Sequence, residues 1–86
     1  MRVAATGVSK ASELIFLNSE EAWTSEENFT IVLDRKAQET LKQQGVDDVR
    51  RHFEGQSIRI AGTLSLYRDR PQIIVSDAGK IQLTKR

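Results

Sequence analysis

The sequence predicts an all-β domain with a short helical insert, in which five strands form a barrel. Its length is the first reason, because 86 residues provide one small core and are too few for two domains. Apolar and polar residues alternate in several short segments, as in strands with one buried face. One central segment, 34–53, has apolar residues at helical spacing instead. We therefore expect a single domain over residues 1–86, in the order strand, strand, strand, helix, strand, strand.

Three strands are expected before the helical segment. The third has the clearest pattern, because Phe29, Ile31 and Leu33 alternate with residues that face the other way. The second is also rich in β-branched and aromatic residues, whereas the first is short and rich in alanine. The expected strands are 3–9, 13–18 and 29–34.

The helical segment is expected in two pieces. Ala37 and Leu41 are four residues apart, as on one face of a helix, and Asp34 precedes them as an N-cap. Gly45 is placed to end this first piece. The pair Asp47-Asp48 is placed to cap the second piece.

The longest strand is expected at 58–67, with Gly62 at its middle. A glycine there allows the strand to bend and to serve two faces of a barrel. A tight connection at 68–71 leads to the fifth strand, which begins at 72–76, is broken at 77–79 and is completed at 80–84. The alternation predicts one continuous core made of Phe29, Ile31, Leu33, Ile58, Ile60, Leu64, Leu66, Ile73 and Val75.

Charge is distributed unevenly along the chain, although the net charge is only +1. Residues 1–34 carry two basic and six acidic side chains, whereas residues 35–86 carry eleven basic and six acidic ones. Four glutamates gather in the polar segment 19–28, which reads as an exposed loop. A polyanion is therefore expected to bind the second part of the chain.

Several classes of site and of protein are disfavoured. The chain has no cysteine and one histidine, His52, so we expect no disulfide, no metal site and no cofactor. The longest apolar run, 14–17, is too short for a membrane span, and residues 1–5 carry no apolar signal-peptide core. No glycine-rich phosphate loop or nucleophile motif is present, so we expect no enzymatic activity.

The last third of the chain carries the most specific sequence pattern: Gly55, Gly62, Tyr67, Arg70, Pro71, Ile73, Val75, Asp77 and Ile81. Together with segments 15–18 and 28–33, this pattern makes residues 8–84 resemble the bacterial OB-fold nucleic-acid-binding domains of the tRNA-anticodon-binding-like type. The resemblance implies a five-stranded OB barrel with its helix between the third and fourth strands. It also implies more chain before Gly7. We therefore expect residues 1–86 to be excised from a longer protein, with a clipped first strand and an open edge beside it.

Five residues are candidates for contact with nucleic acid: Lys10, Arg59, Tyr67, Arg68 and Arg70. The resemblance implies a groove between the loop that holds Lys10 and the hairpin that holds both Arg68 and Arg70. Bases would stack on aromatic rings there, and phosphates would meet cations. Each residue also has a plainer interpretation. The hairpin arginines fit turn chemistry, Tyr67 fits a cover for the barrel edge, Lys10 fits a solvated side chain, and Arg59 fits a cross-strand partner.

We therefore expect a non-enzymatic module that binds single-stranded DNA or RNA weakly and in a salt-sensitive way, because few cations converge. The alternative is an accessory or protein-interaction module that meets other domains of a parent protein. The placement of the cations distinguishes the two. Gathering of Lys10, Arg59, Arg68 and Arg70 on one surface favours nucleic acid, whereas scattering of these cations, or burial of Tyr67, favours the interaction module.

Overall fold

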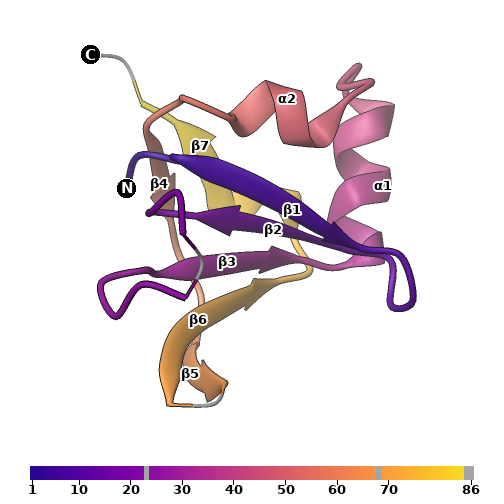
Figure 1. Ribbon diagram of the computed structural model, residues 1–86. Coiled ribbons are helices and arrows are strands. Elements are labelled where there is room, and N and C mark those ends of the chain that lie inside the picture. Colours follow the sequence, from indigo (N-terminus) through magenta and orange to yellow (C-terminus); the bar gives the residue numbers. More distant parts are fainter. Residues whose placement is uncertain (23, 68, 85–86) are drawn as a thin grey trace.

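A computed structural model describes residues 1–22, 24–67 and 69–84 of the chain. Strands dominate, and two short helices lie at one side of them (Figure 1). In the described ranges no helix has the length and apolar character needed to cross a membrane. The elements are β1 (Ala5–Ser9), β2 (Leu14–Asn18), β3 (Thr30–Leu33), α1 (Arg35–Gln43), α2 (Val49–Phe53), β4 (Ile58–Ile60), β5 (Leu64–Tyr67), β6 (Arg70–Val75), the 3-10 turn η1 (Ala78–Lys80) and β7 (Ile81–Leu83).

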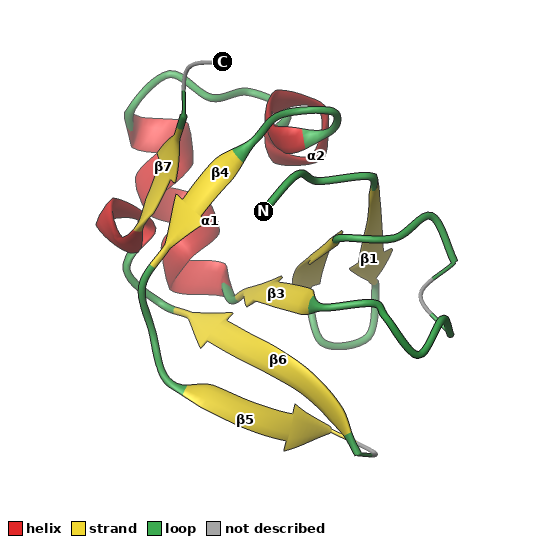
Figure 2. Ribbon diagram, turned by 90° about the vertical axis from the view of Figure 1, so that its left-hand side faces the viewer, coloured by secondary structure: helices red, strands yellow, loops and turns green. Residues whose placement is uncertain are grey.

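The strands form two sheets. Five strands pair in the order β1-β2-β3-β6-β5, and β4 pairs with β7 in a second, two-stranded sheet. All pairs are antiparallel except β3 with β6, which are parallel. The strand-rich fold with a short helical insert is confirmed, whereas the strands do not form one continuous closed sheet (Figure 2).

The long strand expected at 58–67 is divided in two. Its first part, β4, belongs to the smaller sheet, and its second part, β5, ends the larger one. The chain turns between them near Gly62, where a Cβ atom would lie 2.6 Å from Cγ2 of Ile73. Only glycine fits so close an approach, so the expected bend is present and it separates two strands rather than curving one.

The start of the chain makes hydrogen bonds to two segments, β2 and the segment that leads into β4. Every residue of β1 faces a residue of β2, and β2 pairs with β3 on its other side, so the strand next to the first one has the partners that were expected to be missing. β1 itself ends the larger sheet. The segment before β1 reaches the strand β4, because the Ile58 amide donates to the Met1 carbonyl at 2.7 Å. The Val3 amide donates to the Gln56 carbonyl at 2.8 Å, and Val3 is fully buried.

The two helical pieces begin and end as the sequence predicts. The Asp34 carboxylate caps α1 by accepting a hydrogen bond from the Ala37 amide at 3.0 Å. The Asp48 carboxylate caps α2 by accepting from the Arg51 amide at 3.1 Å. Gly45 lies between the helices with φ +95°, a conformation that glycine adopts without strain.

The core lies between the larger sheet, the helices and β4, and its most deeply buried large side chains are Leu17, Ile31, Leu33, Ile58 and Val3. Seven of the nine predicted core residues are in this core or pack against it. The prediction is wrong for Leu64 and Leu66, which are 59% and 68% exposed. Both lie on β5, in a hairpin that projects from the body of the protein (Figure 1). Alternation identifies the apolar face of a strand, but it does not show whether another element covers that face.

Candidate binding groove

A groove crosses the outer face of the larger sheet and has a volume of about 510 Å³. The strand register explains which residues reach it. Asn18 of β2 lies opposite Thr30 of β3, and Thr30 lies opposite Gln72 of β6, so the three side chains form a row on one face. The residues that line the groove are Phe16, Asn18, Thr24, Asn28, Thr30, Tyr67, Arg70, Pro71 and Gln72.

A network of neutral side chains forms the polar end of the groove. Asn28 donates through Nδ2 to Oδ1 of Asn18 at 3.2 Å and to Oγ1 of Thr30 at 3.0 Å. Thr30 in turn donates through Oγ1 to Oδ1 of Asn18 at 2.8 Å. The Glu20 amide donates to Oδ1 of Asn28 at 3.1 Å. These bonds connect the end of β2 to the segment 19–28, which we call the acidic loop.

Two amide side chains at the groove have spare hydrogen-bonding capacity. Asn18 is only 7% exposed, and its Oδ1 accepts two bonds, yet its Nδ2 has no partner among the described residues. The described residues contain no fully enclosed side-chain nitrogen or oxygen that lacks a partner, so this Nδ2 is not fully enclosed, and Asn18 lines the groove. The half-buried Gln72 amide also has no side-chain bond within the described ranges. The groove therefore offers neutral donors and acceptors to a ligand.

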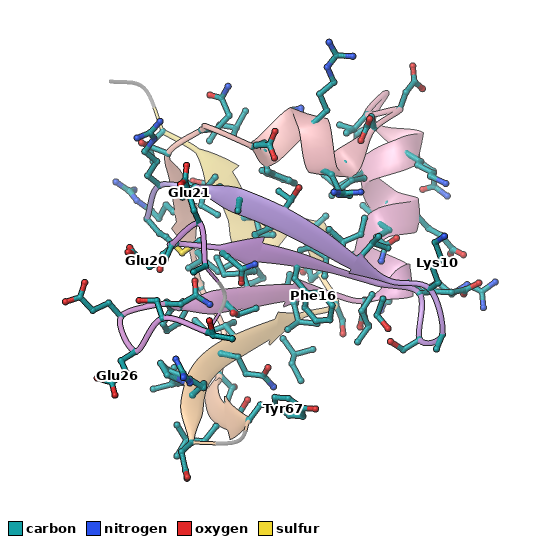
Figure 3. The ribbon with its side chains drawn as sticks, in the orientation of Figure 1. Lys10, Phe16, Glu20, Glu21, Glu26 and Tyr67 are labelled. Atoms are coloured by element: carbon teal, nitrogen blue, oxygen red, sulfur yellow. The ribbon has the colours of Figure 1, made fainter. Side chains whose placement is uncertain are left out.

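Two aromatic rings line the same groove, Phe16 on β2 and Tyr67 on β5, and both are labelled in Figure 3. Phe16 is half-buried on β2, and Tyr67, at the end of β5, is 57% exposed. Tyr67 was expected either to face the ligand or to cover the barrel edge, and it lines the groove. Two aromatic rings in one groove suit a flat or extended ligand group.

Arg70 connects the hairpin to the acidic loop. It lies directly opposite Tyr67, is half-buried, and donates through Nη1 to the carbonyl oxygen of Ser25. The guanidinium therefore already has one protein acceptor, which reduces its capacity for a phosphate. The bond also fixes the position of the loop beside the groove.

The loop beside the groove is acidic. Glu21, Glu26 and Glu27 are exposed and Glu20 is half-buried. Figure 3 shows Glu20, Glu21 and Glu26 projecting from the loop at the end of the sheet far from Lys10. The field at this end of the groove is therefore negative unless a partner neutralises it.

The remaining predicted site residues do not gather at the groove. Lys10 lies in the turn between β1 and β2, beside a separate hollow whose lining includes Glu13 and Arg35 of α1. Arg59 is exposed on β4 and lines another hollow, with Met1 and Ser57 among its neighbours. Arg68 lies outside the described residues. Of the five candidates, the structure brings together Tyr67 and Arg70.

Seven lining residues were not among the predicted site residues: Phe16, Asn18, Thr24, Asn28, Thr30, Pro71 and Gln72. A signal for one of them was present in the sequence, because Asn18 ends an apolar strand where a buried amide needs a polar partner. The row across β2, β3 and β6 depends on strand register between distant segments, which a single sequence does not specify.

The groove has no features of a metal centre. Within the described ranges no group of three or more His, Asp or Glu side chains is placed to hold a metal ion.

Comparison with family models, with curated proteins and with solved structures gives no match.

Proposed function

We propose that this chain is a non-enzymatic binding module and that its groove holds an extended segment of a partner polypeptide. The observation that carries this proposal is the scattering of the cations. Lys10 and Arg59 line separate hollows, and Arg70 is bonded to the Ser25 carbonyl. A polyanion binds tightly where several cations neutralise its charges and release its counterions, and among the described residues that line the groove Arg70 is the one cation.

The proposal includes an OB-type barrel as the scaffold, supported by three features. The helices α1 and α2 lie between β3 and β4 in the chain, as in the expected order. The strands β3 and β6 are parallel, which brings the last hairpin back beside the middle of the sheet. The hydrogen bonds between residues 1–3 and 56–58 connect the first segment to β4.

The chemistry of the groove suits a peptide backbone. Each residue of an extended peptide offers a carbonyl and an amide, and Asn18 Nδ2 and the Gln72 amide provide neutral partners for such groups. The rings of Phe16 and Tyr67 provide apolar contact for side chains. The glutamates of the acidic loop favour a segment that carries lysine or arginine.

Single-stranded nucleic acid is the second candidate, and one observation favours it. Phe16 and Tyr67 line the same groove as Arg70, which is the combination of stacking platform and cation that the sequence predicted. The negative acidic loop and the separate positions of Lys10 and Arg59 act against it.

A titration followed by amide chemical shifts distinguishes the candidates. The peptide probes are an unlabelled basic peptide of alternating Lys and Ser and a matching acidic peptide of alternating Glu and Ser. The nucleic-acid probes are oligo(dT) and oligo(rU). The proposal expects the basic peptide to shift amides of β2, β3 and β6 and the acidic peptide to leave them unchanged. Shifts at these strands with the oligonucleotides alone would replace the proposal by the second candidate. No shift with any probe at low salt would refute both.

A matched pair of glutamine variants places the binding in the groove. Gln72→Ala removes a groove amide, whereas Gln82→Ala removes an exposed amide on β7. The proposal expects Gln72→Ala to weaken binding of the basic peptide by about tenfold, the effect of about one hydrogen bond, and Gln82→Ala to leave it unchanged. Equal effects of the two substitutions would contradict binding in the groove.

A further inference from the structure

The outer edge of β5 is an exposed strand edge without a charged or proline side chain. Among the described residues, β5 ends the five-stranded sheet and pairs with β6 alone. It projects with its hairpin from the rest of the protein (Figure 2). Exposed edges in natural proteins commonly carry a lysine, a proline or another charge that prevents pairing with a second chain. The segment 62–67 carries none of these.

The side chains of β5 add an apolar face to this edge. Leu64 and Leu66 project on the same face of the strand and are 59% and 68% exposed. The other face carries Ser65 and Tyr67, and Ser65 lies opposite the groove residue Gln72. The edge therefore combines the backbone groups of Leu64 and Leu66, which have no strand partner on this side among the described residues, with two leucines on one face and neighbours of the groove on the other.

The strand is complementary to itself. In an antiparallel pair of two copies centred on Ser65, Leu64 of each copy faces Leu66 of the other, and the four leucines share one face. In this register Tyr67 of each copy faces Thr63 of the other. Because no charge lies between 62 and 67, the two-fold axis brings no like charges together.

We propose that the edge of β5 is the dimer interface of this protein and that its occupant is the β5 strand of a second copy, antiparallel and centred on Ser65. The two larger sheets then form one continuous sheet. Both grooves lie on the same face of it, with Thr63 of one copy beside the groove residue Tyr67 of the other. A dimer of this form presents two grooves to one partner, which raises the avidity for a ligand that spans both.

Cysteine cross-linking tests the register directly, because the chain has no natural cysteine. Directly opposite residues have Cα atoms about 4.5–5.5 Å apart, within the range of a disulfide. Copies of residue 64 are offset by two positions and lie about 8 Å apart, beyond that range. Under mild oxidation Ser65→Cys is expected to form a covalent dimer readily and Leu64→Cys to form little. Equal cross-linking of the two variants, or none in Ser65→Cys, would overturn the proposal.

Sedimentation equilibrium tests the interface without any groove ligand. The unmodified chain is expected to dimerise as its concentration rises, and Leu66→Lys to weaken the dimer by at least about tenfold. Leu83→Lys, at a residue 46% exposed on β7, is the matched control and is expected to leave the dimer unchanged. Mixing Leu66→Lys with Leu64→Glu is expected to restore a dimer, because the new charges face each other in this register. Circular dichroism confirms that each variant is folded. A chain that stays monomeric at all concentrations refutes the proposal, whatever the groove binds.

Discussion

Asn18 has two separate functions at the groove. Its Oδ1 accepts hydrogen bonds from Asn28 and Thr30 and so holds the acidic loop against the sheet. Its Nδ2 has no partner in the described part of the chain and is not fully enclosed, and Asn18 lines the groove. The structural and the binding contribution of this residue therefore belong to different atoms, and a substitution can separate them.

Asn18→Asp is expected to remove the hydrogen bond from Nδ2 of Asn18 to a carbonyl group of the peptide, while the protein stays folded. An aspartate keeps both acceptor contacts, with Asn28 and Thr30, and replaces the free donor by an acceptor. For an uncharged peptide of Ser and Gly, on which the added negative charge has little effect, the loss of one donor predicts a binding constant weaker by about tenfold. Shift titration measures it, and circular dichroism checks the fold. Peptide affinity equal to that of the unmodified chain would show that Nδ2 does not contact the ligand.

Glu13 has an unfavourable backbone conformation, with φ 58°, in the turn between β1 and β2. A side chain in this region costs about 1–2 kcal/mol, whereas the exposed ion pair of Glu13 with Arg35 at 3.2 Å contributes about 0–1 kcal/mol. Glu13→Gly is therefore expected to raise the free energy of unfolding by about 1 kcal/mol in urea denaturation. Ala11→Gly, in the same turn without positive φ, is the control and is expected to lower it. A loss in both variants would show that the ion pair outweighs the strain.

The helices show how well local signals predict an element. Both N-caps and the glycine between the helices were predicted, because a cap depends on side chains within three residues of it. The β5–β6 hairpin shows the opposite case. Its position depends on the parallel pairing of β6 with β3 and on the bond from Arg70 to Ser25, both of which join distant segments.

Two adjacent aspartates before α2 provide a test of the cap. Asp48 accepts a hydrogen bond from the Arg51 amide, whereas Asp47 is exposed and outside the cap. Asp48→Ala is expected to lower the free energy of unfolding by about 1 kcal/mol, and Asp47→Ala to change it by less than about 0.5 kcal/mol. Urea denaturation of both variants measures the difference. Similar losses of stability in the two variants would mean that Asp47 and Asp48 both contribute to capping α2.

For the whole molecule, the strand-rich fold, the element order and the helical insert could be predicted from alternation, helical spacing and length. The division into two sheets and the row Asn18, Thr30 and Gln72 could not, because they follow from the parallel pairing of β3 with β6. Residues 35–86 carry an excess of basic side chains, yet the candidate cations of this part that the structure describes do not lie together. A linear charge count does not show on which face of the fold each side chain lies.

Two leucines that were predicted to lie in the same core differ widely in their exposure. Leu33 is fully buried on β3, and Leu66 is 68% exposed on β5. Leu33→Ala is expected to lower the free energy of unfolding by about 2–5 kcal/mol, since it leaves a cavity that the sheet and α1 fill only in part. Leu66→Ala is expected to change it by less than about 0.5 kcal/mol, measured in urea at a concentration low enough for the monomer. For a domain of this size, whose stability is about 5–15 kcal/mol, the first substitution brings the chain near unfolding and the second does not. Equal losses would mean that β5 packs into the core of the monomer, and its edge would then not be available to a second copy.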